Sequence, residues 1–205
     1  MIRLIGLILV SYLIGSFPTS YVMGKILKGI DLREHGSGNL GATNVFRVVG
    51  KTAGIITLLI DAFKGFIPAF LFPRLIMTWT PELSLALLDV GVILGVAAIL
   101  GHMFTLFMKF KGGKGVATSL GVFLALAPAP LLVTVVVCSA IMAATRYVSL
   151  GSISGALLLP ILIIVLYPDS RLLIIFSLII GGIIIARHKT NIKRLLQGSE
   201  NKLRW

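Results

Sequence analysis

The sequence predicts an all-α fold, a polytopic membrane bundle of helices. Three observations support this prediction: 57% of the 205 residues are hydrophobic, only 13% are charged, and the mean hydropathy is +1.04. The apolar residues also come in long runs, and about 20 helical residues suffice to cross ~30 Å of hydrocarbon. We therefore expect a single integral membrane domain over residues 1–205.

Seven apolar stretches are expected to span the membrane. The stretch 115–146 is longer than one span needs, and Pro128 and Pro130 in its middle are expected to end one helix and begin another. We therefore divide it into a short span and a second one. A five-span arrangement, with 115–146 as one helix and a cytoplasmic excursion, is the alternative. The expected spans are 2–24, 52–73, 84–108, 115–127, 130–146, 150–167 and 171–187.

The distribution of Lys and Arg predicts the orientation, because cations near span ends are retained on the cytoplasmic side. Fifteen of the 19 Lys and Arg residues fall in loops 25–51, 109–114 and 146–149 and in the tail from residue 187. Lys64 lies inside a span. The opposite side holds Arg3, Arg74 and Arg171. The N-terminus is thus predicted outside and the C-terminus in the cytoplasm.

One predicted cytoplasmic loop, Lys111-Gly112-Gly113-Lys114-Gly115, combines two cations with three glycines. Glycine can adopt a positive φ and turn successive N–H groups inward, and lysine adds a compact charge. The loop also precedes a helix, whose N-terminus attracts anions. We therefore expect a phosphate-binding loop rather than lysines that only set the topology. It is not a nucleotide P-loop, because Met108 and Gly115 stand where that motif needs Gly and Ser or Thr.

The first cytoplasmic loop carries a run of small and amide residues followed by an arginine. Its glycines permit a tight turn, and Thr43 or Asn44 is expected to cap a short interfacial helix that carries Arg47. A solvated turn with a topology-setting arginine is the alternative. The candidate binding residues here are Ser37, Asn39, Gly41, Thr43, Asn44 and Arg47.

Two further groups lie at predicted cytoplasmic span ends. Arg146 and Ser149 join the fifth and sixth spans, and a guanidinium can hold a phosphate bidentately. On a helix continuing from the seventh span, His188 and Asn191 would lie one turn apart on one face and bind one hydroxyl-bearing substrate. The alternatives are a topology-setting arginine and an ordinary polar helix end.

Asp61, Lys64 and His102 lie inside predicted spans. Asp61 and Lys64 are three residues apart and can pair, either as a structural ion pair or in the site itself. We expect His102 to support the site by hydrogen bonding. The acidic residues are too scattered to hold a metal, and the lone Cys138 is expected to pack in an apolar run. No metal and no cofactor are therefore expected.

The ordered motifs resemble those of a known family. They are Gly15-Ser16-Phe17-Pro18-Thr19-Ser20-Tyr21, Ser37 to Asn44, Asp61-Ala62-Phe63-Lys64-Gly65, Gly101-His102, Lys111 to Gly115, Arg146-Tyr147-Val148-Ser149 and His188-x-x-Asn191. In this order they are similar to the bacterial membrane glycerol-3-phosphate acyltransferase that uses acyl-phosphate. The resemblance covers essentially the whole chain.

The resemblance implies transfer of a fatty acyl group from acyl-phosphate to the 1-hydroxyl of sn-glycerol 3-phosphate. The products are lysophosphatidic acid and phosphate, at the head of phospholipid biosynthesis. It also implies a multi-pass protein of the bacterial cytoplasmic membrane, with its active site facing the cytoplasm. We expect membrane lipid around the protein, no nucleic acid and no obligate protein partner.

The donor is a mixed anhydride with a good leaving group, so no enzyme nucleophile is needed. We expect direct attack by the glycerol hydroxyl, while Lys114 and the N–H groups of Gly112–Gly115 stabilise negative charge. Arg146 is a second candidate for an anion. His188 is either a general base or an orienting group. The expected catalytic residues are Lys114, His188, Asn191 and Ser149.

A transporter of phosphate or an organophosphate is the alternative function. Such a protein would place polar residues near mid-membrane in discontinuous helices, often in two related halves. The Asp61–Lys64 pair and the proline-broken stretch favour it. The gathering of polar residues on one side and the lack of an internal repeat favour the enzyme.

Overall fold

The structure is a computed structural model that describes residues 1–81 and 84–203, where all regular structure is helical. Arg204, counted above among the cytoplasmic cations, lies outside the described residues. The chain divides into two compact units, Met1–Leu126 and Ala127–Trp205. The helices are α1 (Ile2–Ser16), α2 (Thr19–Lys28), α3 (Ala42–Val48), α4 (Lys51–Trp79), α5 (Leu87–Met103), the 3₁₀ turn η1 (Leu106–Met108), α6 (Val116–Leu126), α7 (Pro128–Thr145), α8 (Val148–Leu166), α9 (Arg171–Arg187) and α10 (Lys189–Leu196).

Within the described residues the predicted all-helical fold is confirmed, but fewer segments than the seven predicted have the length and composition of a span. In the described part of the chain, five segments are long and apolar enough to cross a membrane, and the bent pair α9–α10 makes a possible sixth. The stretch 115–146 is broken between α6 and α7, so the alternative of one helix there is wrong. Helix α6 has 11 residues. At 1.5 Å per residue it is about 17 Å long, shorter than ~30 Å of hydrocarbon. The five segments are Ile2–Lys28, Lys51–Trp79, Leu87–Met108, Pro128–Thr145 and Val148–Leu166.

The first span contains a break that the sequence analysis did not predict. Helix α1 ends at Ser16 and α2 begins at Thr19. Pro18 between them lacks an N–H group and disfavours the helical conformation at the preceding residue. Phe17 accordingly adopts φ −55° and ψ 120°. The backbone carbonyls at this break therefore need hydrogen-bond partners from elsewhere.

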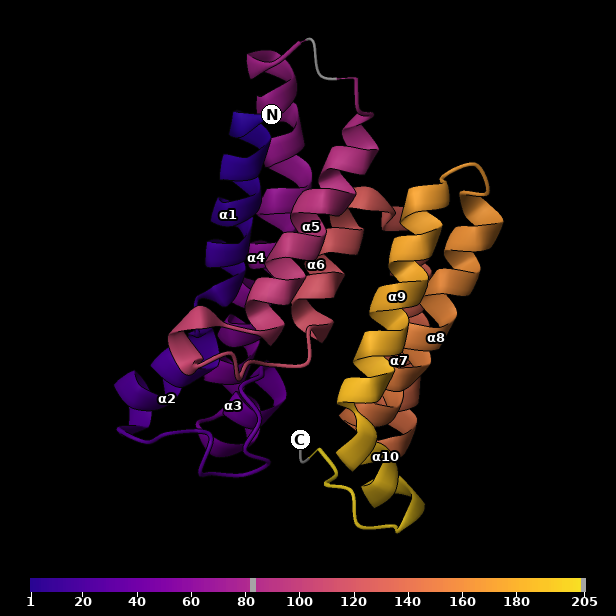
Figure 1. The fold of residues 1–205 in the computed structure, drawn as a ribbon. Helices are drawn as coiled ribbons and strands as arrows, with labels where there is room; N and C mark the ends of the chain where they lie inside the picture. The colour runs from indigo at the N-terminus through magenta and orange to yellow at the C-terminus, as the bar shows by residue number, and fades with distance from the viewer. Residues whose placement is uncertain (82–83, 204–205) are drawn as a thin grey trace. The chain divides into compact units, whose positions relative to one another are not determined.

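In the first unit, α1, α4, α5 and α6 lie side by side (Figure 1). At one end of this bundle, Leu4 packs with Ile76 and Val90. At the other end, the Ser16 hydroxyl donates to the Gly101 carbonyl. Helices α1 and α5 therefore run in the same direction, and α4 runs opposite to them, as consecutive spans must.

Glycines allow these helices to approach closely. A Cβ on Gly15 of α1 would overlap the carbonyl of Ala98 in α5, and a Cβ on Gly121 of α6 would overlap the carbonyl of Ala62 in α4. Small residues at such contacts are a common feature of helix packing in membranes. The close packing brings the C-terminal ends of α1 and α5 together.

The 29–41 loop and the 104–115 segment lie at one end of the first unit's bundle, together with α2 and α3 (Figure 1). An apolar cluster ties the 29–41 loop and α3 to η1 and α4. It consists of Leu32, Leu40, Val45, Ala53 and Met108. The loops 25–51 and 109–114, predicted to share one side of the membrane, therefore lie at the same end of this unit.

In the second unit, α7, α8 and α9 pack side by side (Figure 1). The tail returns to the α7–α8 turn, where the Leu203 N–H donates to the Arg146 carbonyl at 2.8 Å. The expected continuous helix after residue 187 is wrong, because the chain bends by 57° between α9 and α10. His188 lies at the bend, and its Nδ1 is 2.8 Å from the Ile184 carbonyl. A side chain that bonds a helical carbonyl is a known cause of such bends.

Candidate active-site residues

The glycine loop, residues 111–115, is fastened to the end of α5. The Gly112 N–H donates to the Met103 carbonyl at 3.0 Å, and the Gly113 N–H donates to the His102 carbonyl at 3.2 Å. The last carbonyls of a helix have no partner within the helix, and the loop supplies two. The expectation that these two N–H groups face an anion is therefore wrong.

The loop nevertheless requires its glycines. A Cβ on Gly112 would overlap the His102 carbonyl, and a Cβ on Gly113 would overlap the His102 ring and lie 2.8 Å from the Leu40 carbonyl. Gly115 has φ +86°, where other residues are strained. The glycines thus let the loop pack against α5 and Leu40 and turn into α6.

The anion-binding features of this loop lie at its C-terminal end. Lys114 is half-buried, and only Gly115 separates it from the start of α6 at Val116, whereas Lys111 is exposed. The first N–H groups of a helix lack partners within that helix, and its macrodipole favours negative charge there. Lys114 and the start of α6 therefore form a candidate anion site.

Asn44 holds the first loop together. It is only 1% exposed. Its Oδ1 accepts the Ser37 N–H at 2.9 Å, and its Nδ2 donates to the carbonyls of Leu32 and His35 at 3.1 and 3.0 Å. Gly41, not Thr43 or Asn44, is the N-cap of α3, so the predicted side-chain cap is wrong. An Asn side chain inside a helix can instead bond neighbouring backbone, which here orders the loop.

The first loop, which carries the other candidate residues, lies next to the glycine loop. Leu40 lies in this loop and its carbonyl contacts Gly113, so the first loop and the glycine loop are neighbours. The remaining candidates are all partly exposed: Ser37, Asn39, Gly41, Thr43 and Arg47. The structure therefore brings together the two loops of the first unit that the sequence singled out.

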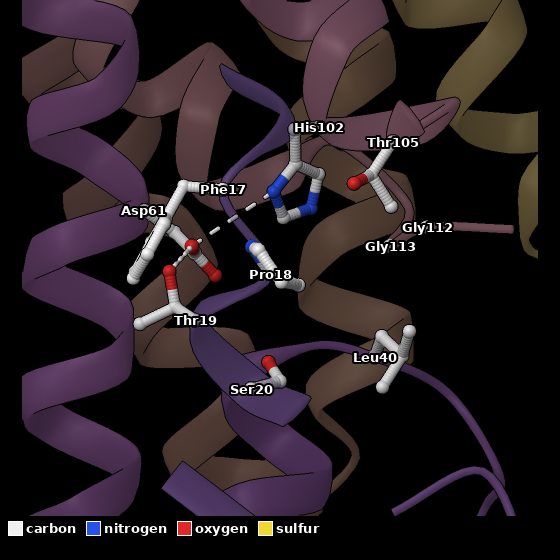
Figure 2. Close-up of a pocket in the computed structure, with 10 residues that line it drawn as sticks. All are labelled: Phe17, Pro18, Thr19, Ser20, Leu40, Asp61, His102, Thr105, Gly112 and Gly113. Atoms are coloured by element: carbon white, nitrogen blue, oxygen red, sulfur yellow. Dashed lines mark hydrogen bonds and ion pairs between the residues drawn. The ribbon is translucent and has the colours of Figure 1, made fainter. Parts of the chain in front are cut away.

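A pocket lies beneath the glycine loop, lined among others by Thr19, Asp61, His102 and Gly113 (Figure 2). The predicted ion pair is present here, with Lys64 Nζ 2.7 Å from Asp61 Oδ1. The Thr19 hydroxyl donates to the same carboxylate oxygen at 2.9 Å. His102 Nδ1 lies 3.9 Å from it. A buried polar cluster thus lies directly under the loop that carries Lys114.

In the second unit, Glu200 joins two of the predicted site residues. Its Oε1 accepts a hydrogen bond from the Ser149 hydroxyl at 2.9 Å and one from Asn191 Nδ2 at 2.7 Å. All three side chains are buried, with 5%, 8% and 7% of Ser149, Asn191 and Glu200 exposed. The predicted grouping of Ser149 with Asn191 in one place is therefore present.

These hydrogen bonds decide what the second unit offers a ligand. A Ser149 hydroxyl that donates to Glu200 has only lone pairs left, whereas an Asn191 amide that donates one Nδ2 N–H also carries a second N–H and a carbonyl oxygen. At His188, the contact between Nδ1 and the Ile184 carbonyl places the proton on Nδ1, so a neutral ring has Nε2 as an acceptor. Such a combination of acceptors and a donor suits the hydroxyl groups of a polyol, which both donate and accept.

Arg146 lies at the turn before α8. It is exposed and caps α7 with φ 63°. Its carbonyl accepts the Leu203 N–H, which connects the turn to the tail that carries Glu200. Arg146 is thus the cationic member of the group of candidates in the second unit.

Glu200 was not among the predicted site residues, because the acidic residues were considered only as metal ligands and are too scattered to hold a metal. A signal was present, since Glu200 is the one acidic residue of a strongly basic tail with Lys193, Arg194 and Lys202.

Within residues 1–81 and 84–203, no three His, Cys, Asp or Glu side chains are grouped so that they could hold a metal ion.

Comparison with known proteins supports the resemblance seen in the motifs. A family model described as glycerol-3-phosphate acyltransferase matches residues 5–198. The glycerol-3-phosphate acyltransferase of Endomicrobium trichonymphae is 46% identical over 197 residues, which cover 96% of this chain and 94% of that protein. That of Fusobacterium nucleatum is 46% identical over 198 residues, 97% of each chain.

Solved structures show the same fold. The chain is similar to the glycerol 3-phosphate form of PlsY (YgiH), an integral membrane glycerol 3-phosphate acyltransferase. The TM-score is 0.85 and the identity 39%, over 98% of this chain and 96% of that one. For the lysophosphatidic acid form, the TM-score is 0.82 and the identity 38%, over 98% and 95%. The chain is thus a multi-pass integral membrane protein, and with a family model that spans both units it belongs to the glycerol-3-phosphate acyltransferase family.

Proposed function

We propose that this glycerol-3-phosphate acyltransferase uses acyl-phosphate as its donor and acylates the 1-hydroxyl of sn-glycerol 3-phosphate. The observation that carries the proposal is the half-buried Lys114 between a glycine loop and the start of α6, in an otherwise apolar bundle. A phosphate with a fatty chain needs both a cation and apolar surroundings. PlsY (YgiH) has a glycerol 3-phosphate form and a lysophosphatidic acid form, which supports the same acceptor and product here.

In the proposed reaction, the acceptor hydroxyl oxygen attacks the acyl carbon of the donor. The new ester bond forms as the acyl carbon–oxygen bond to phosphate breaks, and phosphate leaves with that electron pair. The hydroxyl proton passes to His188 Nε2 or to phosphate. Lys114 and the first N–H groups of α6 stabilise the negative charge that develops on the donor and departing phosphate.

The remaining residues of the first unit shape the donor phosphate site in this proposal. Asn44 orders the first loop through its three backbone hydrogen bonds. Gly112 and Gly113 fasten the glycine loop to α5. The side chains proposed to line the phosphate site are Ser37, Asn39, Thr43, Arg47 and Lys111, with the backbone of Gly41 and Gly115.

The second unit supplies the acceptor-binding residues in this proposal. Ser149 and Asn191, oriented by Glu200, accept hydrogen bonds from the glycerol hydroxyls. His188 binds or deprotonates the attacking hydroxyl, and Arg146 binds the phosphate of the acceptor. Both units, residues 1–205, then form one catalytic domain, without a metal, a cofactor or an obligate protein partner.

We further propose seven spans in the bacterial cytoplasmic membrane, with the N-terminus outside and the active site facing the cytoplasm. The Lys and Arg distribution and the alternating directions of α1, α4 and α5 support this topology. Two single cysteines in a Cys138→Ser protein test the orientation. A membrane-impermeant maleimide should label Ser84→Cys in intact cells and Gln197→Cys only after permeabilisation. The reverse pattern would refute the orientation.

Phosphate release from acyl-phosphate by detergent-purified protein tests the reaction, with and without glycerol 3-phosphate. Release should require the acceptor and yield lysophosphatidic acid. Lys114→Ala should lower kcat about 10²- to 10³-fold, as removal of a charge-stabilising donor does. Lys51→Ala, which removes an exposed lysine of the same unit, is the matched control. An intact wild-type protein that releases no phosphate would refute the choice of donor.

A further inference from the structure

Asp61, Lys64 and His102 have no part in the reaction proposed above, yet all three are buried. Asp61 and His102 line the same pocket as Gly112 and Gly113 of the glycine loop (Figure 2). We propose that the Asp61–Lys64 pair is a positioning device for this loop. The pair fixes the break between α1 and α2 and, through it and His102, the place of the loop that presents Lys114. This inference rests on the proposed function of Lys114.

The first link joins the ion pair to the helix break. The Lys64 ammonium donates to the Phe17 carbonyl, to the Thr19 hydroxyl and to Asp61 Oδ1. An ammonium has three N–H groups, and these three acceptors match them. Pro18 leaves the break without a continuous helical hydrogen-bond ladder. Lys64 therefore replaces part of that ladder and fixes the direction of the chain there.

The second link joins the break to the end of α5. The Thr105 hydroxyl donates to the Ser16 carbonyl, and the Ser16 hydroxyl donates to the Gly101 carbonyl at 3.3 Å. Ser16 and Thr105 are 0% and 3% exposed, so water does not compete for these bonds. The segment 101–105 is therefore tied to the last residue of α1, directly beside the break.

The third link joins that segment to the glycine loop. The carbonyls of His102 and Met103 accept the N–H groups of Gly113 and Gly112. The His102 ring lies between Asp61 and the loop, with Nδ1 3.9 Å from Asp61 Oδ1 and Nε2 against Gly113. A shift of the ion pair would thus reach the loop both through the backbone and through the imidazole.

Burial argues that the pair acts through the loop rather than on a substrate. Asp61 and Lys64 are 1% and 5% exposed, and their hydrogen bonds are directed at Phe17, Thr19 and each other. An ion pair at this depth is costly to bury and is weak evidence for stability by itself. A loop displaced by 1 Å, in contrast, can lower a rate by about 10²-fold. The contribution of the Asp61–Lys64 pair is therefore to fix the position of the glycine loop.

The test replaces both charges at once. Asp61→Leu/Lys64→Met keeps the approximate size of the side chains and leaves no unpaired buried charge, so the protein is expected to fold. We expect an unfolding temperature close to that of the wild type. We also expect kcat to fall about 10- to 100-fold, with the KM for both substrates within about threefold. A folded double variant with wild-type kcat would overturn the proposal.

If the double variant does not fold, two variants of His102 test the proposal instead. Asn and Leu have nearly the same shape, but only Asn places a polar atom where His102 Nδ1 faces Asp61. We expect the kcat of His102→Asn to exceed that of His102→Leu by about tenfold. Equal kcat values in the two folded variants would overturn the proposal, because a role in packing alone does not distinguish them.

Thr57→Val is the matched control on the same helix. Thr57 is 0% exposed, and its hydroxyl donates to the Ala53 carbonyl one turn away at 2.8 Å. Its kcat should equal that of the wild type. The outcomes also separate the two proposals. A wild-type protein without acyl-phosphate activity refutes the proposed function, whereas an active wild type with an equally active double variant refutes only this inference.

Discussion

Replacement of Glu200 should disable the proposed acceptor-binding group of the second unit. Glu200 Oε1 accepts two hydrogen bonds, from Ser149 at 2.9 Å and from Asn191 at 2.7 Å. Glu200→Ala removes both. Glu200→Gln keeps an oxygen of the same shape but removes its charge. The two variants therefore separate the loss of the bonds from the loss of the charge.

The geometry sets the size of the effect on stability. A hydrogen bond to a charged group contributes about 1.5–3 kcal/mol, so Glu200→Ala loses about 3–6 kcal/mol. Each kcal/mol lowers the Tm of a chain of this size by about 2–4 °C, so even the lower bound corresponds to about 6–12 °C. Neutral bonds are roughly half as strong, so Glu200→Gln should show about half that shift.

The effect on activity follows from the orientation of Ser149 and Asn191. If each loses about 1.4 kcal/mol of interaction with the transition state, kcat/KM for glycerol 3-phosphate falls about 100-fold in Glu200→Ala. The measurement is initial-rate kinetics at saturating acyl-phosphate, beside thermal unfolding in the same detergent. Glu34→Ala, at an exposed glutamate, is the control and should change neither quantity.

A double-mutant cycle gives the sharpest check. Because Ser149 and Glu200 share one hydrogen bond, the effects of Ser149→Ala and Glu200→Ala should not add. If the double variant equals the sum of the single variants within about 0.5 kcal/mol, or if Glu200→Ala retains wild-type kcat/KM, the reasoning from this geometry is refuted.

Three further predictions concern single positions. Gly113→Ala should lower both Tm and kcat, because its Cβ would overlap the His102 ring, whereas Gly6→Ala, with open space around it, should lower neither; equal behaviour of the two would contradict the packing. The hydrogen-bonded Arg33 guanidinium lowers the pKa of Asp31 from 3.8 to about 2. The Arg33–Asp31 pair should therefore add less than about 1 kcal/mol of folding stability above pH ~4, and this contribution should be lost as the pH falls through about 2. The Tm curves of the wild type and Asp31→Asn should converge at that pH, and curves that diverge there would contradict the prediction. If His188 is the general base, His188→Asn should lose one ionisation from the pH profile of kcat, and an unchanged profile would show that it only orients the substrate.

The helices and their arrangement in sequence were predictable, because the signals for them are local. Apolar runs of span length mark the segments, and Pro128 at the start of α7 ends the preceding helix for steric reasons that act within one turn. Pro18 carried an equally local signal for the break after α1, which the analysis overlooked. The loops around Asn44 and Lys114 were recognised from their glycines, amides and cations.

The hydrogen-bond partners of those residues were not predictable. The N–H groups of Gly112 and Gly113 could serve an anion or a carbonyl, and only the end of α5 beside them decided the choice. The Asn44 amide could cap α3 or order the loop before it, and the fold selected the loop. In each case the residue type fixes what a group can donate or accept, while packing decides which partner is near enough.

The sequence by itself thus determined an all-helical, multi-span membrane protein and an ordered set of motifs that identifies the family. The tertiary structure decided which hydrogen-bond partners these residues have. Ser149 and Glu200 are 51 residues apart, so no local pattern couples them. Backbone stereochemistry acts over a few residues, whereas a buried hydrogen bond between distant residues exists only after the helices that carry them have packed.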